Sequence, residues 1–190
     1  RDVNYSARME NRFAQKRFLS DYPNQLIMTT VDPITLSVIR GVLETTQREM
    51  TLALERTARS SVFNLGHDYS TAMFNATPEM IMQGQDIPIH LGSLMPAMKA
   101  VAGYFGEDIH DGDVLLHNDP AYSGSHILDM CMYKPVFYKG EHIFWTVCKG
   151  HLTDIGGPVP AGYNPEAKEI YAEGLRVPPI KLWEKGKRRE

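Results

Sequence analysis

Two apolar runs, MCMYKPVFY (residues 130–138) and IFWTVC (residues 143–148), flank the dipeptide Lys139-Gly140. Both runs are rich in aromatic and β-branched residues, which favour strands, and a short connection containing glycine favours a tight turn. The pattern therefore predicts an antiparallel hairpin. Because the two open ends of a hairpin are neighbours in space, the residues before 130 should lie beside those after 148.

A histidine followed three residues later by an aspartate borders each strand of this hairpin. His126 and Asp129 end the stretch NDPAYSGSHILD (residues 118–129), and His151 and Asp154 lie within GHLTDIGG (residues 150–157). Imidazole nitrogen and carboxylate oxygen are ligands for Mn²⁺, Fe²⁺ or Zn²⁺. The sequence therefore predicts one shared metal site with three or four ligands from His126, Asp129, His151 and Asp154. Asp154 is either the fourth ligand or an acceptor that orients His151, and Asp119 is a possible addition.

Each of these pairs also has a simpler interpretation, an imidazole–carboxylate hydrogen bond at the end of a strand. Asp119 likewise suits a turn, because an aspartate before proline favours one. Two other histidines are candidates for catalytic residues. His90 stands just before a predicted helix, and His67, with Asp68, stands at a predicted strand entrance. A buried histidine with satisfied hydrogen bonds is the alternative for His90.

The rest of the chain predicts an α+β fold. Asp32-Pro33 is a helix start, and apolar residues recur at helical spacing over residues 33–57. Further elements are a helix from a Ser93 cap to Gly106 and strands over residues 69–74, 80–82 and 114–116. The expected architecture is a mixed or antiparallel sheet with hairpins, packed by the long N-terminal helix and the second helix. No closing strand or helix is expected after Asp154.

Composition narrows the functional class. The chain has 190 residues, of which 43% are hydrophobic and 23% charged, and this balance is typical of a globular protein. A net charge of −3 does not indicate a nucleic-acid partner, and no apolar run approaches the roughly 20 residues of a membrane span. Cys131 and Cys148 lie in apolar runs, which favours reduced thiols in a cytoplasmic protein.

Several motifs in one order resemble the hydantoinase B family. They are DPITL (32–36), IPIHLGS (87–93), the two histidine-bearing stretches and EIYAEGLRVPP (169–179). The resemblance implies that residues 32–190 form the N-terminal part of a metal-binding domain that continues beyond residue 190, after an N-terminal arm over residues 1–31. Within the family, the polar arm and KGHLT (149–153) look most similar to the alpha subunits of acetone carboxylases.

That closer resemblance implies a subunit of an ATP-dependent enzyme that joins acetone and bicarbonate into acetoacetate, with Mn²⁺, or else Zn²⁺ or Fe²⁺, at the histidine–aspartate site. It also implies a hydantoinase A-like partner that binds ATP and a small third subunit. The chain itself has no phosphate-binding loop motif. Two alternatives stay open: ATP-dependent hydrolysis of a hydantoin or 5-oxoproline ring at the same site, and a non-catalytic interaction fragment.

Overall fold

The computed structural model describes residues 31–160 and 164–190. Every site discussed below lies within residues 38–190, the second of the two units into which the chain divides. The predicted N-terminal arm, residues 1–31, lies outside the described residues apart from its last position. The α+β fold class is confirmed.

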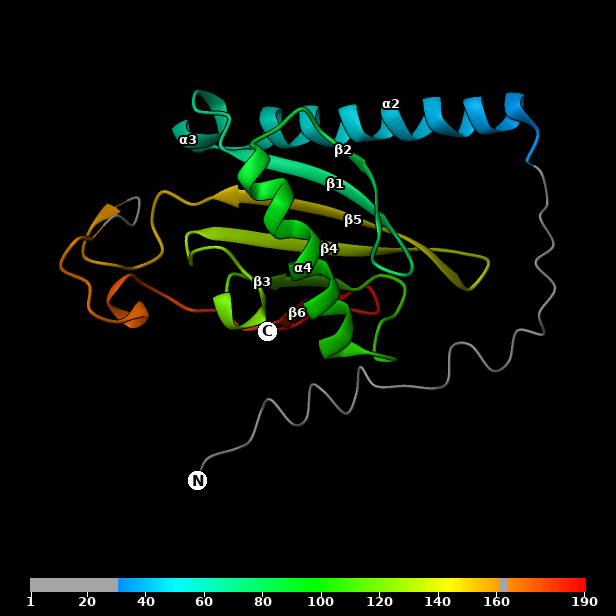
Figure 1. Ribbon diagram of the computed structural model, residues 1–190. Coiled ribbons are helices and arrows are strands. Elements are labelled where there is room, and N and C mark those ends of the chain that lie inside the picture. The colour runs from blue at the N-terminus through cyan, green and yellow to red at the C-terminus, as the bar shows by residue number, and fades with distance from the viewer. Residues whose placement is uncertain (1–30, 161–163) are drawn as a thin grey trace. The chain divides into compact units, whose positions relative to one another are not determined.

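Seven strands within the described residues form an antiparallel sheet in the order β2-β1-β5-β4-β3-β6-β7. They are β1 (Tyr69–Asn75), β2 (Met80–Gln83), β3 (Val114–His117), β4 (Asp129–Tyr138), β5 (Glu141–His151), β6 (Ile180–Glu184) and β7 (Lys187–Arg188). Figure 1 shows β4 and β5 as a long central pair. Their hairpin closes at Lys139 and Gly140, whose φ angles of 50° and 84° fit a tight hairpin turn.

The helices of the described residues are α2 (Pro33–Thr57), α3 (Ser61–Asn64) and α4 (Pro88–Phe105), with short 3₁₀ turns η1 (Pro120–Tyr122) and η3 (Ile170–Ala172). α2 spans the predicted range. It contacts β1 through polar groups: Gln47 Nε2 donates to Thr71 Oγ1 at 3.0 Å, and the hydroxyls of Thr51 and Thr71 lie 2.7 Å apart. None of the helices in these ranges is long and apolar enough to cross a bilayer.

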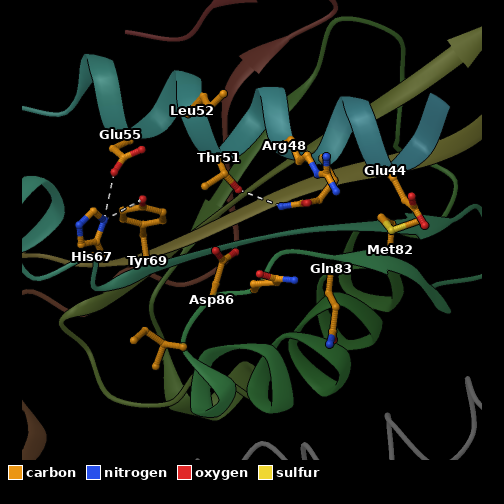
Figure 2. Close-up of a pocket in the computed structure, with 13 residues that line it drawn as sticks. Glu44, Arg48, Thr51, Leu52, Glu55, His67, Tyr69, Met82, Gln83 and Asp86 are labelled. Carbon is orange, nitrogen blue, oxygen red and sulfur yellow. Dashed lines mark hydrogen bonds and ion pairs between the residues drawn. The ribbon is translucent and has the colours of Figure 1, made fainter. Parts of the chain in front are cut away.

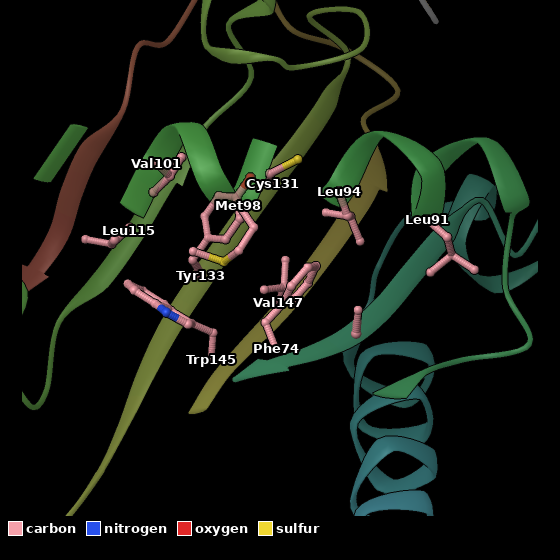
Figure 3. Packing of buried hydrophobic residues seen from close by; sticks show 11 residues of the cluster. Phe74, Leu91, Leu94, Met98, Val101, Leu115, Cys131, Tyr133, Trp145 and Val147 are labelled. Carbon is pink, nitrogen blue, oxygen red and sulfur yellow. The ribbon is translucent and has the colours of Figure 1, made fainter. Parts of the chain in front are cut away.

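The hydrophobic core lies between α4 and the face of the sheet that α4 crosses (Figures 1 and 3). Its buried members are Ala72, Phe74, Leu91, Leu94, Met98, Val101, Leu115, Cys131, Tyr133, Trp145 and Val147. Burial of this apolar surface is the main force that docks the helix. α4 begins at Pro88 and not at the predicted Ser93 cap, because a proline fits the first helical turn. Ser93 therefore lies inside the helix.

The expectation that no element closes the fold after Asp154 is wrong. β6 pairs with β3, and β7 pairs with β6. The inward position of β6 is a lysine: Lys181 Nζ lies 2.9 Å from Asp108 Oδ1 and 3.1 Å from Asp113 Oδ2. Because a salt bridge fills the place of an apolar side chain, the strand lacks the alternation that would have predicted it.

The two cysteines are free thiols, as predicted. Cys131 pairs across the sheet with Lys149, whereas Cys148 pairs with Met132. Successive residues of a strand point to opposite faces, so the two thiols lie on opposite sides of the sheet. Burial raises the pKa of each thiol to about 11, which keeps both protonated and unreactive.

Candidate metal centre

Three of the predicted ligands meet at the open end of the β4–β5 hairpin. Asp129 is the first residue of β4, His151 is the last residue of β5, and the two are cross-strand partners. His126 lies in the loop between η1 and β4. The antiparallel pairing, visible in Figure 1, therefore brings the two histidine-bearing stretches together.

One carboxylate oxygen, Asp129 Oδ1, is the centre of this cluster. His126 Nε2 lies 2.7 Å from it, and His151 Nδ1 lies 3.3 Å from it. Donor atoms of the three residues all lie within 4.8 Å of one another. The side chain of Asp129 is 3% exposed and that of His126 is 37% exposed, so solvent reaches the cluster from the side of His126.

The second oxygen, Asp129 Oδ2, is held from the protein side. Ser125 Oγ donates a hydrogen bond to it, Lys149 Nζ lies 3.1 Å away, and His90 Nε2 lies 3.6 Å away. Burial raises the pKa of Asp129, but hydrogen bonds from His126 and Ser125, the nearby ring of His90 and the charge of Lys149 outweigh burial and hold the pKa far below its usual range. Asp129 is therefore a carboxylate anion throughout the physiological pH range.

Lys149 is a site residue that the sequence analysis missed. Its side chain is 0% exposed, and its Nζ lies 2.6 Å from Ser93 Oγ and 2.5 Å from Ser125 Oγ. A lysine at the end of an apolar run suggests a strand end at the surface. The cross-strand pairing with Cys131, which faces the core, places Lys149 under α4 instead.

His90, a predicted catalytic candidate, lies at the cluster. It is 3% exposed, in the first turn of α4, and its Nε2 also lies 3.4 Å from Asp68 Oδ1. The backbone carbonyl of Asp68 accepts a hydrogen bond from His151 N at 3.0 Å. Asp68 follows His67 in the sequence but is not predicted to lie near His151, because the long-range pairing of β1 with β5 leaves no local pattern.

His67, the other catalytic candidate, faces a different surface. Its Nδ1 lies 3.1 Å from Glu55 Oε1 and 3.3 Å from the hydroxyl of Tyr69. Figure 2 shows these three residues in the wall of a cavity of about 850 Å³ between α2 and the β1–β2 side of the sheet. His67 has a φ of 49°, and the chain turns there so that His67 lines the cavity while the carboxylate of Asp68 lies beside His90.

The structure does not bring Asp154 or Asp119 into the cluster. Asp154 is exposed, and its Oδ1 accepts a hydrogen bond from Gly156 N at 2.8 Å, closing a turn. Asp119 is buried, caps η1 by accepting from Ala121 N at 2.9 Å, and pairs with Arg176 Nε at 2.8 Å. Both aspartates thus take the local turn and capping roles that are common for this residue.

Residues 32–190 match the family model of hydantoinase B/oxoprolinase, and the chain belongs to this family. It is 79% identical over 163 residues to caprolactamase subunit beta of Pseudomonas jessenii, covering 86% of this chain and 28% of that protein. It is 32% identical over 163 residues to the 5-oxoprolinase of Dictyostelium discoideum, covering 86% of this chain and 13% of that protein. The chain thus spans well under a third of the length of these relatives.

Two solved structures share the fold. The crystal structure of the ATP-dependent caprolactamase from Pseudomonas jessenii matches with a TM-score of 0.79 at 79% identity, over 84% of this chain and 28% of that chain. The nucleotide-free structure of acetone carboxylase matches with a TM-score of 0.76 at 20% identity, over 87% of this chain and 22% of that chain. The second likeness shows a common fold alone.

The expectation of acetone carboxylation is wrong. The relative at 79% identity is a caprolactamase subunit, and 5-oxoprolinases also match, so the comparisons favour the alternative of lactam hydrolysis. Because both reactions were expected to use the same ligand residues, the ligand motifs could not separate them. Acetone and bicarbonate were expected as substrates only because carboxylation was expected, so the comparisons do not support them either.

Proposed function

We propose that this chain supplies the divalent-metal site of an ATP-dependent enzyme that opens the ring amide of a lactam. The observation that carries the proposal is the convergence of His126 Nε2 and His151 Nδ1 on Asp129 Oδ1. The substrate class is supported by the 79% identity to a caprolactamase subunit, of which this chain covers 28%.

The donor set of the cluster fits a divalent first-row ion. Two imidazoles and a carboxylate suit Mn²⁺, Fe²⁺ or Zn²⁺, and a three-ligand set leaves positions for water or substrate. Ligands bound near 2.1 Å to one ion lie about 3 Å apart, which is close to the separations in the cluster. Asp68, whose Oδ1 lies 3.4 Å from His90 Nε2, lies outside this group of three possible ligands.

When bound, such an ion polarises an amide oxygen and stabilises the negative charge that develops there. The protein side chains supply orientation. Ser125 and Lys149 hold Asp129 Oδ2, so the carboxylate cannot rotate and presents Oδ1 to the two imidazoles. His90 Nε2 lies between Asp68 and Asp129 and links the two carboxylates. The exposed side of His126 is the approach for substrate.

ATP, in this proposal, binds on a partner subunit. The sequence has neither G-x-x-x-x-G-K-[ST] nor G-x-G-x-x-G, and the relative at 79% identity is itself a beta subunit. A hydantoinase A-like partner follows from the family resemblance. The small third subunit stays a prediction of the resemblance to acetone carboxylase alone.

ATP hydrolysis by the assembled full-length complex, measured with caprolactam, 5-oxoproline or acetone as the added substrate, tests the proposed function. We expect stimulation by a lactam and none by acetone. Asp129→Asn keeps the shape of the side chain and removes its charge, and should reduce the lactam-dependent rate at least about 100-fold. The matched control is His142→Ala, because His142 lies on β5 at the end opposite His151. Stimulation by acetone alone, or full activity of Asp129→Asn, would contradict the proposal.

A further inference from the structure

Lys149 carries a buried positive charge directly behind the metal cluster. An ammonium group has three N–H donors, and three acceptors surround this one: Ser93 Oγ at 2.6 Å, Ser125 Oγ at 2.5 Å and Asp129 Oδ2 at 3.1 Å. The side chain is 0% exposed, so water does not share in this coordination. All three donors of Lys149 are thus satisfied by protein.

The hydrogen bonds of the two serines fix the charge state of Lys149. Ser93 Oγ donates its hydrogen to the carbonyl of His90 at 2.9 Å, and Ser125 Oγ donates its hydrogen to Asp129. A hydroxyl has one hydrogen, so each serine can only accept from Lys149. Asp129 Oδ2 also only accepts, so the three contacts need three N–H groups and the network requires an ammonium ion. This excludes a neutral lysine that would activate Ser125 as a nucleophile.

A buried carboxylate is stable only when a positive charge or several hydrogen bonds compensate it. At Asp129 the compensation is divided between the two oxygens. Oδ2 takes the charge of Lys149, whereas Oδ1 faces the rings of His126 and His151. A divalent ion that binds at Oδ1 therefore approaches a carboxylate whose charge Lys149 already compensates at Oδ2. The fixed positive charge of Lys149 also repels the ion.

We infer that Lys149 is an internal counter-ion of the metal site. It holds Asp129 in its binding position before an ion arrives, and it weakens the binding of the divalent ion so that the ion exchanges from a preformed site. This inference rests on the metal site of the proposed function. Lys149 is a positioning residue, because its amine contacts the ligand carboxylate and neither the ion nor the substrate.

The test compares Lys149→Met with Lys181→Met in the full-length protein. Lys181 is also a buried lysine paired with carboxylates, but its partners are Asp108 and Asp113, outside the cluster. The dissociation constants of Mn²⁺ and Zn²⁺ are measured by competition titration after chelation, and the Tm is measured with and without each ion. Lys149→Gln is a second neutral variant in case Lys149→Met does not fold.

We expect Lys149→Met to bind both ions at least about tenfold more tightly than the wild type, because a repelling unit charge is gone. Without metal, the Tm of Lys149→Met should be much lower than that of the wild type. Addition of metal should largely restore the Tm, because the ion then compensates the negative charge of Asp129. Lys181→Met should lose Tm to a similar extent without this recovery. Equal or weaker ion binding by both Lys149 variants would overturn the inference, whereas a wild type that binds neither ion would overturn the metal site itself.

Discussion

Asp129 and His151 face each other across the open end of the β4–β5 hairpin, and their side chains meet at 3.3 Å. Their meeting depends on the register of the hairpin, because a slip by one residue would turn one of the side chains to the opposite face of the sheet. The turn at Lys139-Gly140 and the one-residue register shift between Val136 and Phe137 together set that register. The geometry of the cluster is therefore a consequence of strand pairing.

Replacing Asn118 by alanine should detach the motif segment EIYAEGLRVPP from the sheet. The buried amide of Asn118 donates to the carbonyls of Ile127 and Leu175 at 2.6 and 2.9 Å, and its oxygen accepts from Val177 N at 2.6 Å. Removing three bonds to buried groups should cost about 2–4 kcal/mol of unfolding free energy. Denaturant titration measures the loss, and hydrogen exchange at the amide of Val177 should accelerate.

The control for Asn118 is Asn64→Ala, which removes one exposed hydrogen bond to the carbonyl of Ala58. It should change the unfolding free energy by less than about 1 kcal/mol. An equal loss in the two variants would show that Asn118 does not pin the segment.

Alanine at Gly157 and at Gly41 should change stability in opposite directions. A Cβ at Gly157 would lie 2.3 Å from the backbone oxygen of Glu173, so the two loop segments would have to separate, at a cost of about 1–3 kcal/mol. A Cβ at Gly41, within α2, meets nothing within 4 Å, so alanine there should stabilise by about 0.5–1 kcal/mol. Thermal or denaturant unfolding measures whether each variant is less or more stable than the wild type. A change in the same direction for both variants would be evidence against the close approach of Gly157 to Glu173.

The free energy of unfolding should decrease as the pH falls from 6.5 to 4 because of His117. Burial lowers the pKa of His117 from 6.5 to about 4, and its Nε2 is 2.8 Å from the hydroxyl of Tyr133. Between pH 6.5 and pH 4, His117 is protonated in the unfolded chain and neutral in the folded chain. The contribution of His117 to the unfolding free energy, which is fully present above pH 6.5, is therefore lost as the pH falls. The total loss is about 3 kcal/mol.

His117→Gln removes this titration and keeps a polar group for Tyr133. The difference in unfolding free energy between wild type and variant should therefore change steadily over that pH range. Parallel pH profiles for the two proteins would mean that His117 is protonated as readily in the folded chain as in the unfolded one.

Local patterns predicted the elements that locate the site. The apolar runs around Lys139-Gly140 predicted the hairpin, and residues 33–57 were predicted and found as one helix. The hairpin in turn predicted the proximity of His126, Asp129 and His151, because the two open ends of an antiparallel pair are neighbours in space. Asp154 does not lie with them, because the chain leaves the sheet after His151. The carboxylate of Asp154 instead accepts a hydrogen bond within a local turn.

The missed features depend on tertiary contacts or on buried charge. Lys149 and Lys181 both occupy inward strand positions where sequence patterns lead one to expect apolar residues, and each is stabilised there by carboxylates distant in sequence. Asp68 lies beside His90 only because β1, which it precedes, pairs with β5. The ligand motifs could not distinguish carboxylation from lactam hydrolysis, and the 79% identity over 163 residues was needed to favour the second.

The central claim is that His126, Asp129 and His151 hold one divalent ion. Elemental analysis of the full-length complex, combined with electron paramagnetic resonance for Mn²⁺, tests it directly in the wild type, His151→Ala and His142→Ala. The account predicts about one ion per chain in the wild type and in His142→Ala, and a loss of most of that metal in His151→Ala. A wild type without a divalent ion, or a His151→Ala variant that retains the full amount, would contradict the claim.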